Sequence, residues 1–131
     1  SATSRVLVER PVMDELAGRL AALADEATVG DPTLRANWMG PVINREAYAK
    51  YKKCLDNLVQ HGEVWTGGRQ LTSGALADGY YCAPTVGTAP HDYRLWREEK
   101  FVPIVLVGEV DTFWGELPDA AARAAGEADA L

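Results

Sequence analysis

Two carboxylates and an aromatic ring directly precede an apolar run that is typical of a buried strand. The segment Arg97-Glu98-Glu99-Lys100-Phe101-Val102-Pro103 leads into residues 104–110. A carboxylate there can accept hydrogen bonds from sugar hydroxyls, and an aromatic ring can pack on a flat heterocycle. We expect the segment at a mouth of the sheet, where α/β folds usually bind ligands. On chemistry alone, a ligand site and a solvated charge cluster that caps the strand are equally good interpretations.

The other residues that could do chemistry fit structural roles better. Cys54 lies on the apolar stripe of a predicted helix and Cys82 lies within a predicted strand, so both are expected to pack as small hydrophobes. Neither has the helix N-terminus or neighbouring cation that activates a catalytic thiol. His61 and His91 fall at a helix end and in a Pro-flanked loop, which favours surface positions. No spacing of cysteine and histidine predicts a zinc site or a disulfide.

Strand-like and helical segments alternate along the chain, and this order predicts a layered α/β sheet with flanking helices. The predicted strands span 4–9, 63–66, 80–86 and 104–110, the predicted helices span 12–26 and 45–61, and a helical turn is expected at 94–99. Residues 69–79 are expected to form a loop.

Local signals set the ends of these segments. Pro11 suits a helix start, with Asp14 and Glu15 expected in the first turn. Asn44 is the expected cap of the second helix, and Gly62 its left-handed end. Gly67-Gly68-Arg69 lacks a phosphate-loop pattern and predicts a turn, while Pro84 predicts a strand edge or end.

Composition limits the classes of partner. The chain has 131 residues, a net charge of −6 and no basic run, so nucleic acid is an improbable partner. No apolar stretch is long enough to cross a bilayer, and no signal peptide is recognisable, so a cytoplasmic protein is expected. The chain starts at once on a strand-like run, as a domain that begins in the middle would.

Six short motifs together resemble the aldehyde dehydrogenase family, and most of all its 1-pyrroline-5-carboxylate (glutamate-semialdehyde) dehydrogenase branch. They occur in the order and at the spacing seen in that family, over residues 1 to 110. The motifs are Ser1-Ala2 with Ser4-Arg5-Val6-Leu7-Val8, Val29-Gly30-Asp31-Pro32, Met39-Gly40-Pro41-Val42-Ile43, Thr66-Gly67-Gly68, Gly79-Tyr80-Tyr81-Cys82-Ala83-Pro84-Thr85-Val86 and Glu98-Glu99-Lys100-Phe101-Val102-Pro103.

The resemblance implies the NAD(P)-dependent oxidation of an aldehyde to a carboxylic acid through a thioester. It assigns Glu99 to the nicotinamide ribose and Phe101 to the same end of the cofactor, and Val102 stands where many members have glycine. The nucleophilic cysteine of the family would fall just before Ser1, and its base and glycine-rich segment lie further upstream. The resemblance therefore implies no catalytic residue and no metal ligand within these residues.

The resemblance predicts a partial catalytic domain at 1–110 and a divergent, Ala-rich tail at 111–131 whose composition is compatible with a helix. The first hypothesis for function is a truncated aldehyde dehydrogenase-like protein that is inactive alone and binds NAD(P) weakly or not at all. The alternative is a non-catalytic binding or scaffolding module. Under both, unpaired strand edges and apolar helix faces predict a homo-oligomer or a complementing chain.

Overall fold

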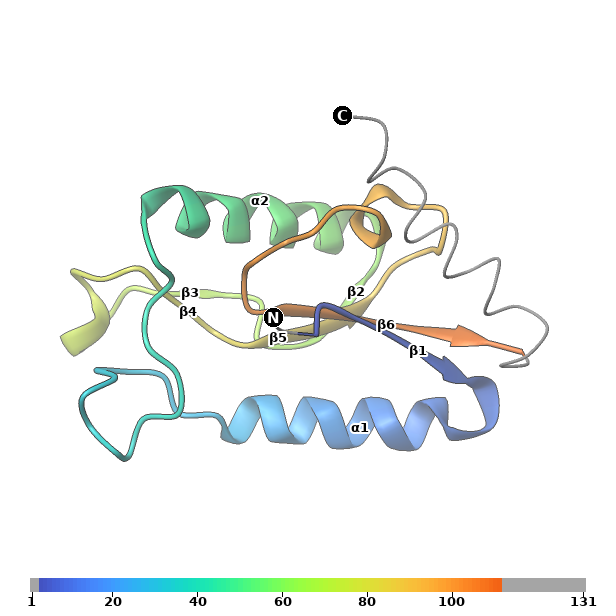
Figure 1. Ribbon diagram of the computed structural model, residues 1–131, viewed down its shortest axis with the longest axis horizontal. Coiled ribbons are helices and arrows are strands. Elements are labelled where there is room, and N and C mark those ends of the chain that lie inside the picture. The colour runs from blue at the N-terminus through green and yellow to red at the C-terminus, as the bar shows by residue number, and fades with distance from the viewer. Residues whose placement is uncertain (1–2, 112–131) are drawn as a thin grey trace.

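Two long helices enclose a four-stranded sheet in the part of the chain that the computed structural model describes, residues 3–111 (Figure 1). The sheet has the order β1-β6-β5-β2, with β1 at Arg5–Glu9, β2 at Glu63–Thr66, β5 at Thr85–Thr88 and β6 at Ile104–Val110. Strands β1 and β5 run parallel to β6, and β2 runs antiparallel to β5. Helix α1 covers one face of the sheet and α2 the other, which confirms the predicted α/β fold class.

Helix α1 spans Arg10–Glu26 and begins two residues earlier than the pattern predicts. Pro11 lies in its first turn, where the missing N–H has no intrahelical partner to lose. Because the helix starts directly after β1, Asp14 and Glu15 lie beyond the first turn, and the expectation that they face the helix dipole there was wrong. None of the α1 side chains is fully buried.

Helix α2 spans Arg45–His61, as predicted, and the Asn44 side chain accepts a hydrogen bond from the Ala47 N–H at 2.8 Å. Gly62 ends the helix differently from the prediction. Its φ of −144° is extended rather than left-handed, and its N–H donates to the Leu58 carbonyl. A Cβ at this position would lie 2.1 Å from the carbonyl oxygen of Thr88, so the close approach of β5, not a left-handed turn, requires glycine here.

The segment from residue 67 to 88 contains more structure than the predicted loop and strand. Gly67 and Gly68 have φ values of 79° and 63°, which confirms the turn. Strand β3 (Gln70–Leu71) then pairs with β4 (Tyr81–Cys82) as a separate two-stranded sheet, and a 3-10 turn, η1 (Gly74–Leu76), lies between them. Pro84 has no N–H to donate, and at this point the predicted single strand divides into β4 and β5.

The hydrophobic core lies between α2 and the sheet. Its buried residues come from α2, β4, β6, the residue that follows β5 and the turn η2 (Arg94–Trp96), which is shorter than the predicted helical turn. They are Tyr51, Cys54, Leu58, Cys82, Ala89, Leu95, Trp96, Ile104 and Leu106. The Tyr51 hydroxyl is satisfied inside this core by the Ala83 carbonyl at 2.9 Å and the Thr85 hydroxyl at 2.7 Å. The sheet is therefore closely packed on its α2 face, whereas α1 contributes no buried side chain to the opposite face.

Within residues 3–111, no helix combines the length and the apolar character needed to cross a membrane. The predicted tail, apart from Asp111, lies outside the described residues.

Candidate functional site

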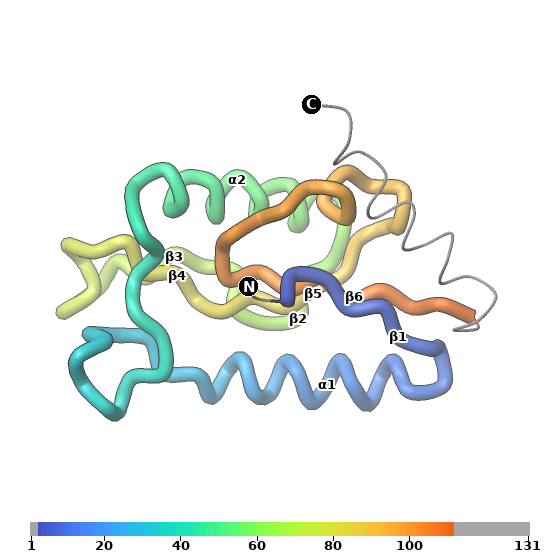
Figure 2. The backbone as a smooth tube through the Cα atoms, viewed as in Figure 1, coloured from blue at the N-terminus to red at the C-terminus, as the bar shows by residue number. Residues whose placement is uncertain are grey.

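The loop of residues 97–103 connects η2 to β6 and crosses the α2 side of the sheet (Figure 2). It enters the sheet through Pro103, whose carbonyl accepts the Thr85 N–H at 2.9 Å. Because β1, β5 and β6 are parallel, the loop lies at the amino ends of these three strands. Open α/β sheets usually bind ligands at the carboxyl ends, so the expected location of this segment at the usual mouth of the sheet was wrong, whereas its role as a ligand site stays a prediction.

In this loop a single buried side chain, Lys100, lies between exposed ones. Glu99 and Phe101 are exposed, with 77% of Phe101 accessible, whereas Lys100 between them is 1% exposed. Phe101 has a φ of 49° and is the one non-glycine residue with a positive φ in the described chain. A non-glycine residue in this region is strained by roughly 1 kcal/mol or more, and such strain often occurs at ligand sites. The left-handed conformation falls on Phe101 and not on Val102, so position 102 does not need the conformational freedom of glycine.

Two lysine side chains, whose role no sequence motif indicated, hold the loop through hydrogen bonds. The Lys100 ammonium donates to the carbonyls of Leu95 and Glu98. On α2, Lys50 donates to the Glu99 carbonyl at 2.9 Å. No local pattern could have indicated Lys50, because the contact joins residues 49 positions apart.

Burial changes the acidity of the groups near the loop. Desolvation lowers the pKa of Lys100 from 10.5 to about 8, because the charged ammonium is disfavoured away from water. Burial also raises the pKa of the Cys54 thiol, and it raises that of Cys82 to about 12. Both cysteines are buried and reduced, which confirms the packing role predicted for them and does not fit an activated nucleophile.

The two histidines take part in ring contacts. His61 is exposed at the end of α2 and packs on Tyr93, with 4.6 Å between ring centroids. His91 is half-buried and meets Trp96 edge-on at 5.2 Å. His61 is thus at the surface as predicted, whereas the surface position predicted for His91 is only partly correct. Between residues 3 and 111, no group of three or more histidine, cysteine or carboxylate side chains could hold a metal ion.

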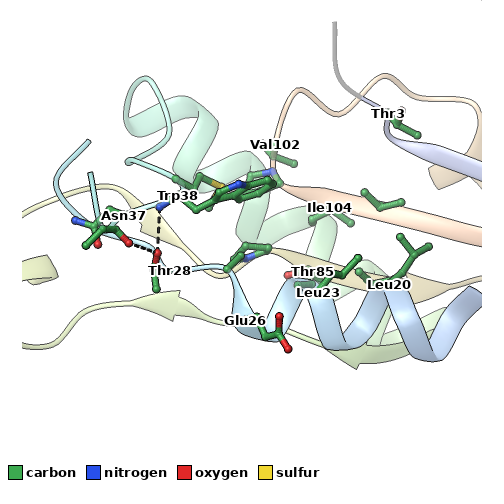
Figure 3. A pocket seen from close by; sticks show the side chains of 18 of the residues that line it. Thr3, Leu20, Leu23, Glu26, Thr28, Asn37, Trp38, Thr85, Val102 and Ile104 are labelled. Atoms are coloured by element: carbon green, nitrogen blue, oxygen red, sulfur yellow. Dashed lines mark hydrogen bonds between the residues drawn. The ribbon is translucent and has the colours of Figure 1, made fainter. Parts of the chain in front are cut away.

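An apolar hollow of about 730 Å³ lies between α1, the loop that follows it and the amino ends of β5 and β6 (Figure 3). Leu20 and Leu23 of α1 line one side, and Trp38 and Val102 lie across from them. The loop that carries Trp38 is held to Thr28, whose hydroxyl accepts the Trp38 N–H at 3.1 Å. The lining offers apolar contact rather than a cluster of reactive groups.

Comparison with known proteins decides the family. The sequence model described as "Aldehyde dehydrogenase family" matches residues 1–124. The chain belongs to the aldehyde dehydrogenase family. The predicted resemblance is therefore confirmed, and the match continues past Val110.

Curated aldehyde dehydrogenase relatives match most of this chain with a small part of their own. A 1-pyrroline-5-carboxylate dehydrogenase 1 of Halalkalibacterium halodurans is 34% identical over 114 residues, which are 86% of this chain and 21% of the relative. A peroxisomal aminoaldehyde dehydrogenase 1 of Pisum sativum is 31% identical over 86% of this chain and 22% of its own length. The chain thus spans about a fifth of the length of these relatives.

Solved aldehyde dehydrogenase structures contain the same fold. An apo betaine aldehyde dehydrogenase of Staphylococcus aureus superposes with a TM-score of 0.85 at 28% identity, over 92% of this chain and 24% of that one. Aldehyde dehydrogenase C of Pseudomonas syringae, in complex with NAD+ and octanal, gives 0.80 at 27% identity, over 95% and 25%. The described fold therefore corresponds to about a quarter of an aldehyde dehydrogenase chain.

Proposed function

We propose that this chain supplies the wall of an aldehyde dehydrogenase active site that contacts the nicotinamide end of NAD(P), through Glu99 and Phe101. Bound NAD(P) would accept a hydride as an aldehyde is oxidised to a carboxylic acid. The chain's own part is to bind and orient that end of the cofactor. Residues 1–110 would act as a partial catalytic domain, and turnover would need the nucleophile, base and nucleotide-binding segment from further polypeptide.

The observation that carries this proposal is the exposed, strained Phe101 beside the exposed Glu99. The Phe101 ring is solvent-accessible and offers a flat apolar surface to a nicotinamide ring. The Glu99 carboxylate is exposed and can accept hydrogen bonds from ribose hydroxyls. The two side chains therefore fit one end of the cofactor. The names of the relatives include both 1-pyrroline-5-carboxylate and aminoaldehydes. The proposal therefore names aldehydes as the substrate class and does not name one particular aldehyde.

The test measures which end of NAD contacts the protein. In saturation-transfer NMR with the full chain and millimolar NAD, we expect stronger transfer to the nicotinamide protons than to the adenine protons. Phe101→Ala and Glu99→Gln should each weaken the nicotinamide signal. Trp38→Ala, a matched change at another exposed aromatic residue, should leave it unchanged. Equal transfer to both ends, or no effect of either site variant, would refute the assignment.

The requirement for further polypeptide has its own test. The chain mixed with NAD and an aldehyde should form no NADH, as followed by absorbance, because covalent and general-base catalysis both need groups assigned elsewhere. Turnover by the 131-residue chain alone would overturn this part of the proposal.

The location that we propose for the chain is the cytoplasm. Its two cysteines are free and buried, which agrees with a compartment where disulfides are rare.

A non-catalytic binding or scaffolding role is the second candidate, and the exposed apolar surface favours it. Trp38 is 80% exposed beside the hollow, and β1 has a neighbour on one side only in the described sheet. Such surfaces promote association, so a homo-oligomer or a complementing chain is the partner we propose. Under this candidate the chain self-associates but gives no nicotinamide signal in the NMR experiment.

A further inference from the structure

Four backbone carbonyls around the 97–103 loop each accept a hydrogen bond from a cationic side chain. Lys100 donates to Leu95 and Glu98, and Lys50 donates to Glu99. From β1, the Arg5 guanidinium donates to the Trp96 carbonyl. The carbonyls at the end of a helical turn have no partner within the turn, so Lys100 and Arg5 satisfy two acceptors, on Leu95 and Trp96, that the short η2 leaves open. The other two carbonyls, of Glu98 and Glu99, belong to the loop itself.

Lys100 differs from the other two cations because it is enclosed by the loop that it holds. Its side chain is 1% exposed and lies between two exposed residues, Glu99 and Phe101. With Lys100 held inward, Glu99 before it and the left-handed Phe101 after it both lie at the surface. Burying an ammonium is unfavourable unless it is well bonded, and the carbonyls of Leu95 and Glu98 supply those bonds.

We propose that the buried ammonium of Lys100 is a positioning group that locks residues 95–101 in the conformation that presents Glu99 and Phe101. The role of Glu99 and Phe101 in this inference rests on the proposed function, whereas the effect of Lys100 on the conformation of the loop does not. Lys100 acts through its neighbours and has no contact with cofactor or substrate.

The lock depends on the charge of Lys100, so it should weaken as the ammonium loses its proton. The ionisable groups that act on Lys100 come from three elements: Lys50 and Cys54 on α2, Arg5 on β1, and Glu98 in the loop. Arg5 and Lys50 favour the neutral amine, whereas Cys54 and Glu98 favour the ammonium. Burial outweighs these effects and brings the pKa to about 8. The loop should therefore be most ordered below pH 8 and loosen above it.

Cleavage by a glutamate-specific protease tests this without cofactor, because Glu98 and Glu99 lie in the loop and are present in every variant. We expect slow cleavage of the wild-type chain at pH 7 and faster cleavage towards pH 9, after correction with an unstructured peptide substrate. Lys100→Met should be cleaved quickly across this range. Lys52→Met, which alters an exposed lysine paired with Asp56 on α2, should behave as the wild type does.

A purely structural role predicts a different pattern. If the Lys100 stem only fills space, Lys100→Met keeps the loop as resistant as in the wild type, and the inference is overturned. A wild-type cleavage rate that does not change between pH 7 and pH 9 overturns it as well, and this measurement remains available if the variant does not fold. The cleavage assay contains no NAD, so its result does not depend on the NMR test of the nicotinamide contact. Failure of the proposed function and failure of this inference are therefore distinguishable.

Discussion

Replacing Lys100 with Met should stabilise the protein as a whole at pH 7 while it loosens the loop. Burial lowers the pKa of Lys100 from 10.5 to about 8, and each unit corresponds to about 1.4 kcal/mol, so charge burial opposes folding by about 3 kcal/mol. Losing the hydrogen bonds to the carbonyls of Leu95 and Glu98 costs about 1–2 kcal/mol. The variant should therefore gain roughly 1–2 kcal/mol in the free energy of unfolding, because the penalty for burying the charge exceeds the value of the hydrogen bonds that the charge makes.

The pH dependence follows from the same shift. Between about pH 8 and pH 10.5 the unfolded chain keeps the Lys100 proton that the folded chain has lost. Because the unfolded state then binds more protons, the free energy of unfolding rises with pH in this window. Below pH 8 the lysine is charged in both states and its full penalty applies. Lys100→Met lacks this dependence, so the stability difference between variant and wild type should shrink as the pH rises through the window.

Urea denaturation followed by tryptophan fluorescence measures both effects, from pH 7 to pH 10.5. Taking the difference between variant and wild type cancels the other groups that titrate in this range. Lys52→Met serves as the control, since its lysine is exposed and its stability difference should stay near zero at every pH. A Lys100→Met variant that is less stable than the wild type at pH 7, or a difference that is constant with pH, would refute the reasoning.

Three further predictions address packing, capping and association. Tyr51→Phe removes a buried hydroxyl that bonds to Thr85 and should lower the free energy of unfolding by about 1–3 kcal/mol in urea denaturation; a neutral result would show that the bond adds nothing. Asn44→Ala removes the acceptor of the Ala47 N–H and should cost about 1 kcal/mol in the same assay, whereas an unchanged midpoint would contradict the cap. In sedimentation the chain should self-associate at micromolar concentration, and Trp38→Ser should weaken this; a wild-type monomer would contradict the exposed-surface argument.

Patterns of near-neighbour residues predicted the elements well, because helix and strand periodicity depend on local spacing. The stripe on α2 and the Asn44 cap placed that helix at Arg45–His61, and the continuous apolar run placed β6 at Ile104–Val110. Gly62 shows the limit of this approach. A glycine after a helix is usually a left-handed end, but here Thr88 in a strand 26 positions later excludes a Cβ. That constraint exists only in the folded chain.

The site shows the same division between near and distant residues. The motif around Glu99 and Phe101 was recognisable because its residues are contiguous, although their contact with a cofactor stays a prediction. The supports of the loop come from Arg5 and Lys50, which are 91 and 49 positions from the carbonyls they bind. Lys100 gave no signal of burial, because a lysine among glutamates is typical of an exposed segment.

The two faces of the sheet differ in how completely the described residues cover them. The groups that hold the 97–103 loop come from β1, α2 and the loop itself, all within residues 3–111, so the loop is supported without further polypeptide. On the opposite face, α1 buries no side chain and the hollow lined by Leu23 and Trp38 remains open. A loop that is already ordered loses little conformational freedom when another polypeptide docks nearby. We therefore expect an added segment to cover the hollow without rearranging Glu99 and Phe101.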